Sequence, residues 1–347
     1  MQDIKALSLQ ELIDVFKEWG ESAFHARQVY AWIYKKREFD FGRMSDLSQP
    51  LREKLAGAFV SGTLEVKEHL VSVDGTEKFL FGLRDRHLIE GVVIPAEGRI
   101  TGCISTQAGC RFSCRFCASG LLGFQRNLGV AEMLDEIILM SSRCRQKRLT
   151  HLVFMGSGEP LDNYDNLMKT IRMANSASAL GIGARRITIS TCGIIPGIAK
   201  LAHEGLQVEL SVSLHAPDDK TRSALMPVNR IFPVRELIAC CRRYVQATKR
   251  QVTFEYVLIK GVNSDLQKAG QLSTILRGFD CKVNLIPVNP VPELGVQPPG
   301  KLEILLFKDA LVKAGIQVTL RKPRGQDVMA ACGQLRLRHA QKTRKAS

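Results

Sequence analysis

The chain has 347 residues, of which 45% are hydrophobic and 24% charged, a composition typical of a globular protein and not of a disordered or fibrous one. It contains no run of eighteen apolar residues, and its N-terminus lacks a basic-then-apolar leader, so we expect a cytoplasmic protein without a membrane span. With 49 Lys and Arg against 34 Asp and Glu, the formal net charge of +15 favours a polyanionic partner such as nucleic acid.

Residues 1–62 have the pattern of a small helical accessory domain. Ser8 and Glu11 form a capping-box sequence before an apolar run, and further helical patterns follow Phe24 and pass through Leu51, Leu55 and Phe59. Basic and aromatic residues alternate in the second of these helices, as in surfaces that stack and clamp RNA. The alternative is that Trp32 belongs to the core and the basic residues are only solvated. The residues concerned are Arg27, Tyr30, Trp32, Tyr34, Lys35, Lys36 and Arg37.

Residues 63–95 read as strands that lead into the core, and residues 96–332 read as the core itself. In the core, short apolar runs alternate with helical patterns such as Val130–Ser142 and Tyr164–Ala174. This alternation predicts parallel β/α units, which we interpret as a partial (β/α)6 barrel whose site lies at the carboxyl ends of the strands. Residues 333–347 read as a basic tail that includes Arg336, either solvated or in contact with a polyanion.

Three cysteines, Cys110, Cys114 and Cys117, lie within eight residues. In a reducing compartment this crowding indicates metal or redox chemistry. Three thiolates can hold three irons of a [4Fe–4S] cluster and leave the fourth iron open to a small molecule. A structural zinc site is the alternative, but it requires a fourth ligand. Four other cysteines in apolar or helical contexts are interpreted as packing residues: Cys144, Cys240, Cys241 and Cys281.

Polar residues follow several of the predicted strands, as a barrel-mouth site requires. Gly158 and Glu159 come after one strand, where a glycine lets the backbone approach a ligand and a carboxylate can accept from an amine. Similar residues follow three later apolar runs, at Ser190–Gly193, Ser213–Ala216 and Asn284–Pro290.

These motifs resemble those of the RlmN/Cfr family of radical-SAM RNA methyltransferases, over nearly the whole chain. The resemblance implies an incomplete β/α barrel with an N-terminal accessory domain, one [4Fe–4S] cluster and S-adenosylmethionine (SAM), two molecules per turnover. Ser157 and Cys192 depart from the residues usual in the family, without loss of a functional group. The most specific segments are Cys103–Cys110, Gly123–Leu128, Phe154–Pro160, Ser213–Pro217 and Arg324–Leu335.

The resemblance also implies a mechanism. One SAM methylates Cys332, and a second binds the open iron and gives a deoxyadenosyl radical that takes hydrogen from this methyl group. The carbon radical adds to adenine, Glu90 acts as the base for the substrate proton, and Cys103 attacks the sulfur of Cys332 to leave a transient disulfide. Read alone, these residues would be two packed thiols and a solvated carboxylate. The SAM contacts carried over are Gly158, Glu159, Ser190, Ser213, Leu214, His215 and Asn289.

The substrate implied is carbon 2 of an adenosine at the peptidyl-transferase centre of 23S rRNA, and the resemblance leaves open an adenosine 3′ of the tRNA anticodon. The resemblance further implies that the enzyme is a monomer and that flavodoxin or ferredoxin supplies its electrons. The nearest alternative is a Cfr-type carbon-8 methyltransferase, against which Pro160 speaks, since Cfr-like proteins tend to carry Ala there. A more remote alternative is a non-catalytic iron–sulfur RNA-binding protein, which would need neither Cys103, Cys332 nor Glu90.

Overall fold

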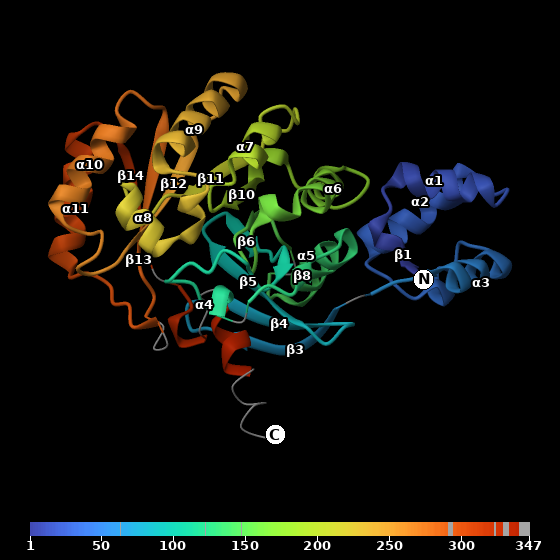
Figure 1. The fold of residues 1–347 in the computed structure, drawn as a ribbon. Helices are drawn as coiled ribbons and strands as arrows, with labels where there is room; N and C mark the ends of the chain where they lie inside the picture. Colours follow the sequence, from blue (N-terminus) through green and yellow to red (C-terminus); the bar gives the residue numbers. More distant parts are fainter. Residues whose placement is uncertain are drawn as a thin grey trace.

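A ten-stranded sheet runs through the computed structural model, which describes residues 1–62, 64–121, 123–146, 148–290, 294–322, 324–328 and 333–339 (Figure 1). Its strand order is β14-β13-β12-β11-β10-β9-β6-β5-β4-β3. From β6 to β14 all pairs are parallel, which confirms the predicted α/β class. The parallel strands are β6 (Arg99–Cys103), β9 (His151–Phe154), β10 (Ile187–Thr191), β11 (Glu209–Ser213), β12 (Val252–Leu258), β13 (Cys281–Pro287) and β14 (Gln317–Leu320).

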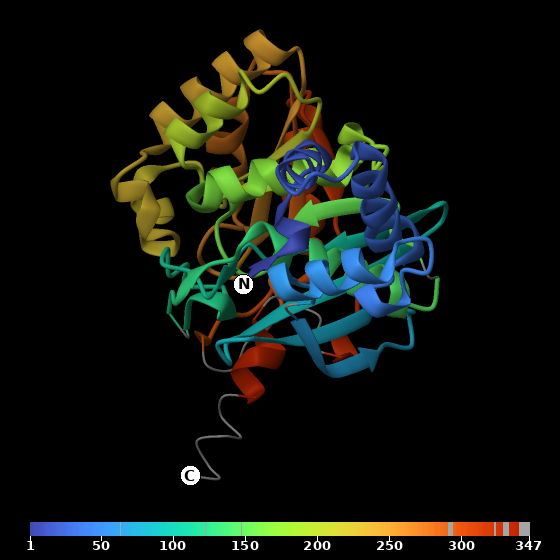
Figure 2. The same cartoon turned by 90° about the vertical axis from the view of Figure 1, so that its right-hand side faces the viewer.

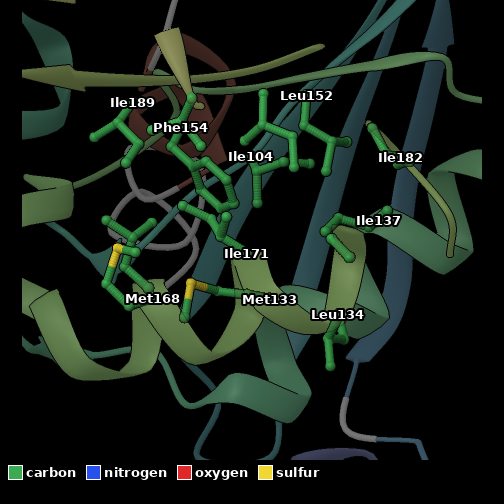
Figure 3. Packing of buried hydrophobic residues seen from close by; sticks show 14 of the residues in the cluster. Ile104, Met133, Leu134, Ile137, Leu152, Phe154, Met168, Ile171, Ile182 and Ile189 are labelled. Atoms are coloured by element: carbon green, nitrogen blue, oxygen red, sulfur yellow. The ribbon is translucent and has the colours of Figure 1, made fainter. Parts of the chain in front are cut away.

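Helices between these strands cover the sheet because their apolar residues recur with a helical period. Figure 3 shows how α5 and α6 meet the strands, with Met133 and Ile137 of α5 facing Leu152 and Phe154 of β9. The four cysteines expected to pack are buried in this same core. The helices are α5 (Val130–Arg143), α6 (Tyr164–Asn175), α7 (Ile195–Leu201), α8 (Asp219–Leu225), α9 (Val234–Thr248), α10 (Leu266–Leu276) and α11 (Lys301–Lys313).

The segment expected to lead into the core is part of the core sheet. Strands β3 (Leu64–Val71), β4 (Glu77–Leu83) and β5 (Leu88–Ala96) extend the sheet through an antiparallel pairing of β5 with β6. Every residue of β4 is buried, including Lys78. A lysine in a buried strand requires an anionic partner, and that partner is described below with the site.

The N-terminal region contains α1 (Leu9–Glu18), α2 (Ala23–Ala31), a π-helical turn (Trp32–Lys36) and α3 (Gln49–Ala58). The predicted capping box of Ser8 and Glu11 is present. A short parallel pair, β1 (Gln2–Asp3) with β2 (Phe59–Val60), closes the region, so Phe59 lies in a strand and not in the third helix. In Figures 1 and 2 these helices lie beside α6, at the end of the sheet remote from α10 and α11.

The predicted RNA-stacking role of Tyr30 and Tyr34 is wrong, because both rings are buried in the core. The hydroxyl of Tyr34 donates to the carbonyl of Lys5 at 3.1 Å. Trp32 is only partly buried, but its indole N–H donates to Asp46 and its ring is covered by the ammonium of Lys36 at 3.2 Å. Tyr30, Trp32 and Tyr34 therefore make their contacts within the protein.

Lys5 joins the N-terminal region to the core through a buried ion cluster. Its ammonium lies 3.0 Å from Asp3 and 3.2 Å from Asp135, which belongs to α5. The lysine side chain is fully buried and both carboxylates are nearly so. Since a buried ion without its partner is far costlier than an exposed one, the fold depends on this contact.

Among the described residues of the chain, no helix is both long and apolar enough to span a bilayer.

We expect Lys5→Ala to destabilise the protein by about 3–5 kcal/mol, because it leaves two buried carboxylates without their cation. The matched control is Lys169→Ala, which breaks the half-exposed 2.7 Å pair with Glu11 across the same junction. Breaking an exposed pair costs about 0.2–1 kcal/mol. Urea unfolding of the two variants measures the difference, and equal losses would contradict the importance assigned to Lys5.

Candidate active site

A cavity of about 220 Å³ opens at the carboxyl ends of the parallel strands. All three cysteines of the Cys110–Cys117 loop line it, as the sequence predicted for a barrel-mouth site. From the strand ends it receives five of the seven residues expected to contact SAM: Gly158, Glu159, Ser190, Ser213 and His215.

The cysteine loop lies between β7 (Gln107–Ala108) and α4 (Ala118–Leu121), and its base is closed by pairing of β7 with β8 (Arg126–Asn127). Gly109 sits at this base with a φ of +89°, and a Cβ there would collide with the carbonyl of Gly123. At the tip, the amide of Cys117 donates to the carbonyl of Cys114 at 3.1 Å. The loop is thus held from both sides, with its thiols directed into the cavity.

Burial governs the electrostatics of these thiols. It raises the pKa of Cys110 to about 12 and that of Cys114 well above its usual value, and the neighbouring thiols reinforce both shifts. Without a cation the thiols of Cys110 and Cys114 are therefore neutral. A metal centre would have to displace their protons on binding, as metal sites do generally.

The donor set fits a cluster better than a single ion. Within the described part of the chain, no three His, Cys, Asp or Glu side chains converge so as to hold one metal ion. A cubane does not need such convergence, because each thiolate binds a different iron. Three partly buried cysteines around one cavity, with the remaining wall formed by other side chains, match a [4Fe–4S] cluster that has one iron open to a ligand.

The turn after β9 has a glycine because no other residue fits. Gly158 has a φ of +104°, and a Cβ there would lie 2.5 Å from the Cβ of Gln107. The next residue, Glu159, is buried and accepts hydrogen bonds from the amides of Cys192 at 2.6 Å and Leu161 at 3.0 Å. Burial raises the pKa of Glu159, while these donors oppose the shift. The side-chain oxygen of neighbouring Ser157 is buried without a hydrogen-bond partner within the described structure.

His215 lines the cavity with a neutral imidazole ring. Its Nδ1 accepts from the amide of Val257 at 3.0 Å, and burial lowers its pKa to about 3. The ring is therefore neutral, and its proton must be on Nε2. The backbone of His215 has a φ of +58°, an unusual conformation for a non-glycine residue. Asn263 holds this turn, because its side-chain amide donates to the carbonyls of His215 at 2.7 Å and Val257 at 2.6 Å.

Arg222 ties the strand-end loops together from beneath the cavity. It is fully buried and donates to the carbonyl of Cys192 at 2.7 Å after β10 and to that of Ser213 at 3.1 Å on β11. It also donates to the carbonyl of Leu214 at 3.1 Å. Leu214 itself is buried and does not line the cavity. Arg222 thus fixes the spacing of two loops that the sequence singled out separately.

A polar wall closes the cavity opposite the cysteines. Glu255 of β12 lines it, accepts from the side-chain amide of Asn284 at 2.8 Å and has its pKa raised by burial. Arg321, just past β14, stands at the exposed rim. Asn289, the seventh residue expected to contact SAM, is partly buried and lies outside the cavity lining.

Glu90 lies at the centre of a second, fully buried polar cluster beside the cysteine loop. Its Oε2 accepts from the ammonium of Lys78 at 2.6 Å and from the amide of Gly333 at 2.7 Å, and its Oε1 accepts from the amide of Arg336 at 2.5 Å. A carboxylate has about four acceptor positions, and among the described residues no donor occupies the second position of Oε1. Glu90 is not a solvated carboxylate, since its exposure is only 3%.

The residues next to Glu90 on β5 show which face of the sheet its side chain occupies. A Cβ on Gly91 would meet Met140 and Glu136 of α5, so Gly91 faces the helix and Glu90 faces the opposite side. Val92 pairs with Cys103 across β5 and β6. Residues that are paired across two strands share a face, so Cys103 lies on the face of Val92. Residues two apart on one strand also share a face, so Val92 and Glu90, and therefore Cys103 and Glu90, lie on the same face.

The C-terminal segment returns to the cysteine loop. A Cβ on Gly333 would collide with the amide of Ser119, two residues after Cys117, and Arg336 donates to the carbonyl of Ser119 at 3.1 Å. Arg336 is 5% exposed, so its assignment to a solvated basic tail is wrong. Cys332 lies outside the described residues, but the next residue in the chain is bonded to Glu90.

Comparison with known proteins agrees with this architecture. The family model of the Radical SAM superfamily matches residues 104–269, and that of the ribosomal RNA large subunit methyltransferase N-terminal domain matches residues 2–60. The crystal structure of a radical SAM methyltransferase from Sphaerobacter thermophilus superposes with a TM-score of 0.93 at 42% identity, covering 96% of this chain and 99% of that one.

Two relatives of full length carry the description probable dual-specificity RNA methyltransferase RlmN. The relative from Thermoanaerobacter sp. (strain X514) is 45% identical over 340 residues, which cover 98% of this chain and 99% of its own. The relative from Geobacillus thermodenitrificans (strain NG80-2) is 45% identical over 342 residues, covering 97% and 93%.

We expect Gly158→Ala to unfold at a clearly lower urea concentration than the wild type, because the new Cβ meets Gln107 in addition to straining the backbone. Gly205→Ala is the matched control, since Gly205 also has a positive φ of +69° but open space around its Cβ position. Backbone strain alone costs about 1 kcal/mol. If both variants lose the same stability, the contact with Gln107 does not restrict this position.

Proposed function

The chain belongs to the RlmN family of radical-SAM RNA methyltransferases, and on that premise we propose that it methylates carbon 2 of an adenosine at the peptidyl-transferase centre of 23S rRNA. Its relatives are described as dual-specificity enzymes. That description supports a second RNA substrate, for which we propose the adenosine 3′ of the tRNA anticodon. We further propose that the enzyme acts as a monomer in the cytoplasm and receives its electrons from a flavodoxin or ferredoxin.

The observation that carries the proposal is the hydrogen bond from Gly333 to Glu90. It brings the residue directly after Cys332 onto the carboxylate expected to act as base. Gly333 simultaneously packs against Ser119, next to the cysteine loop. Glu90, Gly333 and Ser119, which are far apart in the sequence, thus lie together beside the cysteine loop, and this supports a site in which a methyl carrier, a proton acceptor and a radical source work together.

The cavity has the residues to hold both cofactors. Cys110, Cys114 and Cys117 would bind three irons of a [4Fe–4S] cluster. Glu159 and the Nε2 proton of His215 offer an acceptor and a donor to SAM, and Gly158 lets its backbone approach. Bound together, the cluster and two SAM molecules per turnover supply a methyl group and a carbon-centred radical able to take hydrogen from that group.

The chain's own residues would perform the remaining steps. The sulfur of Cys332 would carry the methyl group as a thioether, close to the base that its neighbour Gly333 contacts. Glu90 would take the proton from carbon 2 on the second position of its Oε1. Such a carrier is needed because carbon 2 of adenine is electron-poor and does not attack the methyl group of SAM directly.

Cys103 would release the product. It lies on the same face of the sheet as Glu90, since its strand partner is Val92. The unpaired electron of the base adduct would first return to the iron–sulfur centre, which leaves a closed-shell thioether. The thiolate of Cys103 would then attack the sulfur of Cys332, which forms the S–S bond and breaks the bond between that sulfur and the transferred carbon. The electron pair of the broken bond stays on that carbon, which takes up the proton held by Glu90 and becomes the methyl group. Both thiols end the cycle as a disulfide, which a dithiol reductant must reduce before the next turnover.

Nucleoside analysis after anaerobic reconstitution with a reductant, SAM and rRNA fragments tests the proposed function. We expect 2-methyladenosine from the wild type and none from Cys332→Ala, with the same iron and sulfide content in both proteins. Cys114→Ala is the matched control, because it should lose iron as well as turnover. Normal turnover of Cys332→Ala would overturn the methyl-carrier role, and 8-methyladenosine as sole product would assign the Cfr-type reaction instead.

We expect Cys103→Ala to accumulate a covalent enzyme–RNA adduct, because no second thiol can free the product from Cys332. A denaturing gel with labelled RNA detects the adduct. The double variant Cys103→Ala/Cys332→Ala should give none, since it lacks the sulfur to which the RNA is attached. Free methylated RNA from Cys103→Ala, in amounts equal to the wild type, would exclude Cys103 from product release.

A further inference from the structure

A second cavity of about 260 Å³ lies at the junction between the N-terminal helices and the core. It is lined by residues from the π-helical turn, from the end of α5 and from the loops that precede β9 and β10. Four of these residues are cations, and none of the described residues that line the cavity is Asp or Glu. The cations are Lys35, Arg37, Arg148 and Arg186.

Lys35 and Arg37 are held in place by neutral partners. The ammonium of Lys35 donates to the carbonyls of Ala177 and Ala179, both at 2.7 Å. The guanidinium of Arg37 donates to the carbonyl and hydroxyl oxygens of Ser141 at 3.3 and 3.1 Å. Carbonyl and hydroxyl groups orient a cation but do not cancel its charge, so two fixed positive charges face the cavity.

The backbone of Arg37, like its side chain, is held in one conformation. It ends the π-helical turn with a φ of +57°, in the left-handed region that costs a non-glycine residue about 1 kcal/mol or more. This conformation is maintained by the contacts of Arg37 with α5. The side chain is therefore positioned before any ligand arrives.

Arg148 and Arg186 add two more positive charges to the cavity, from the loops of the core. Both are exposed, and neither forms an ion pair with a carboxylate within the described structure. The field of Arg186 is felt locally, because the pKa of His151 is lowered by its burial and then by Arg99 and Arg186. Four uncompensated cations around one hollow would repel one another, and an anion would relieve that repulsion.

We propose that this cavity binds a phosphate group of the RNA backbone, at a point distant from the adenosine that is methylated. The proposal rests on the proposed function, since it takes the ligand to be the RNA substrate. Lysine and arginine contacts to phosphate position an RNA without reading its sequence. The cavity lies at the amino ends of β9 and β10, and the candidate active site lies at their carboxyl ends. A strand of five residues separates such points by about 15 Å.

The location leads to a specific expectation about RNA length. An RNA long enough to leave the active-site mouth and pass along the N-terminal helices can place a phosphate in this cavity. A short hairpin cut back to the target loop and two base pairs does not extend that far, because each pair adds only about 3.4 Å. The cavity should therefore contribute to binding of long RNA and leave the reaction of the hairpin unaffected.

The test is the double variant Arg148→Gln/Arg186→Gln, which removes the two exposed cations and leaves the anchored pair intact. Its matched control is Arg277→Gln/Lys313→Gln, which removes equal charge at the ends of α10 and α11, at the far end of the sheet (Figure 1). Equal urea midpoints for the two double variants establish that both are folded. The probes are a full-length tRNA transcript and a short hairpin, its anticodon arm cut back to the target loop and two base pairs.

For the full-length transcript, we expect the Kd of the Arg148→Gln/Arg186→Gln variant to rise several-fold. The slope of log K against log salt should fall by about 1 for each phosphate that the variant no longer neutralises. The control should keep the wild-type slope, and all three proteins should methylate the hairpin at the same rate. An unchanged slope in the Arg148→Gln/Arg186→Gln variant, or an equal loss of binding to the hairpin, would overturn the proposal. Failure of the wild type to methylate either RNA would count against the proposed function, while the slopes would still report on the cavity.

Discussion

The buried carboxylate of Glu90 is the group on which the arrangement of the candidate site depends. It accepts from a lysine of the neighbouring strand and from two amides of the C-terminal segment. A carboxylate can enter a protein interior only if such donors surround it. The same requirement therefore links the pairing of β4 with β5 to the return of the C-terminal segment at Gly333 and Arg336.

Most of the fold could be predicted from the sequence because it follows from local patterns. Apolar runs at Leu152–Met155 and Thr253–Ile259 correspond to β9 and β12, each within one residue. The cysteine loop and the Gly158–Glu159 turn were predictable for the same reason, since short spacings and glycines express local geometry. The role of residues 63–95 was harder to predict. Alternation shows that a segment is a strand, but not which sheet it joins.

The contacts that support the site depend on residues distant in sequence. Arg222 reaches the carbonyl of Cys192, thirty residues earlier, and Asn263 fixes His215 over a separation of 48. In sequence, an arginine on a short helix and an asparagine in a loop carry no signal of such roles. For the basic and aromatic residues of the second helix, by contrast, the sequence suggested a role that the structure contradicts. Their composition resembled an RNA surface, whereas Tyr30 and Tyr34 are on the side that packs into the core.

The hydrogen bond between Glu90 and Gly333 spans 243 residues, one of the longest separations in the structure. During synthesis, the sheet and the cysteine loop are complete before the C-terminal segment has left the ribosome. A chain that emerges from its N-terminus first therefore has β4 and β5 available before Gly333 and Arg336 can reach Glu90. The loop between Glu90 and Gly333 can close only after Gly333 has been synthesised. A few hydrogen bonds must then offset the entropy that is lost when so long a loop closes. Gly333 and Arg336 are thus the last of the Glu90 donors to be synthesised, long after Lys78 of the same cluster.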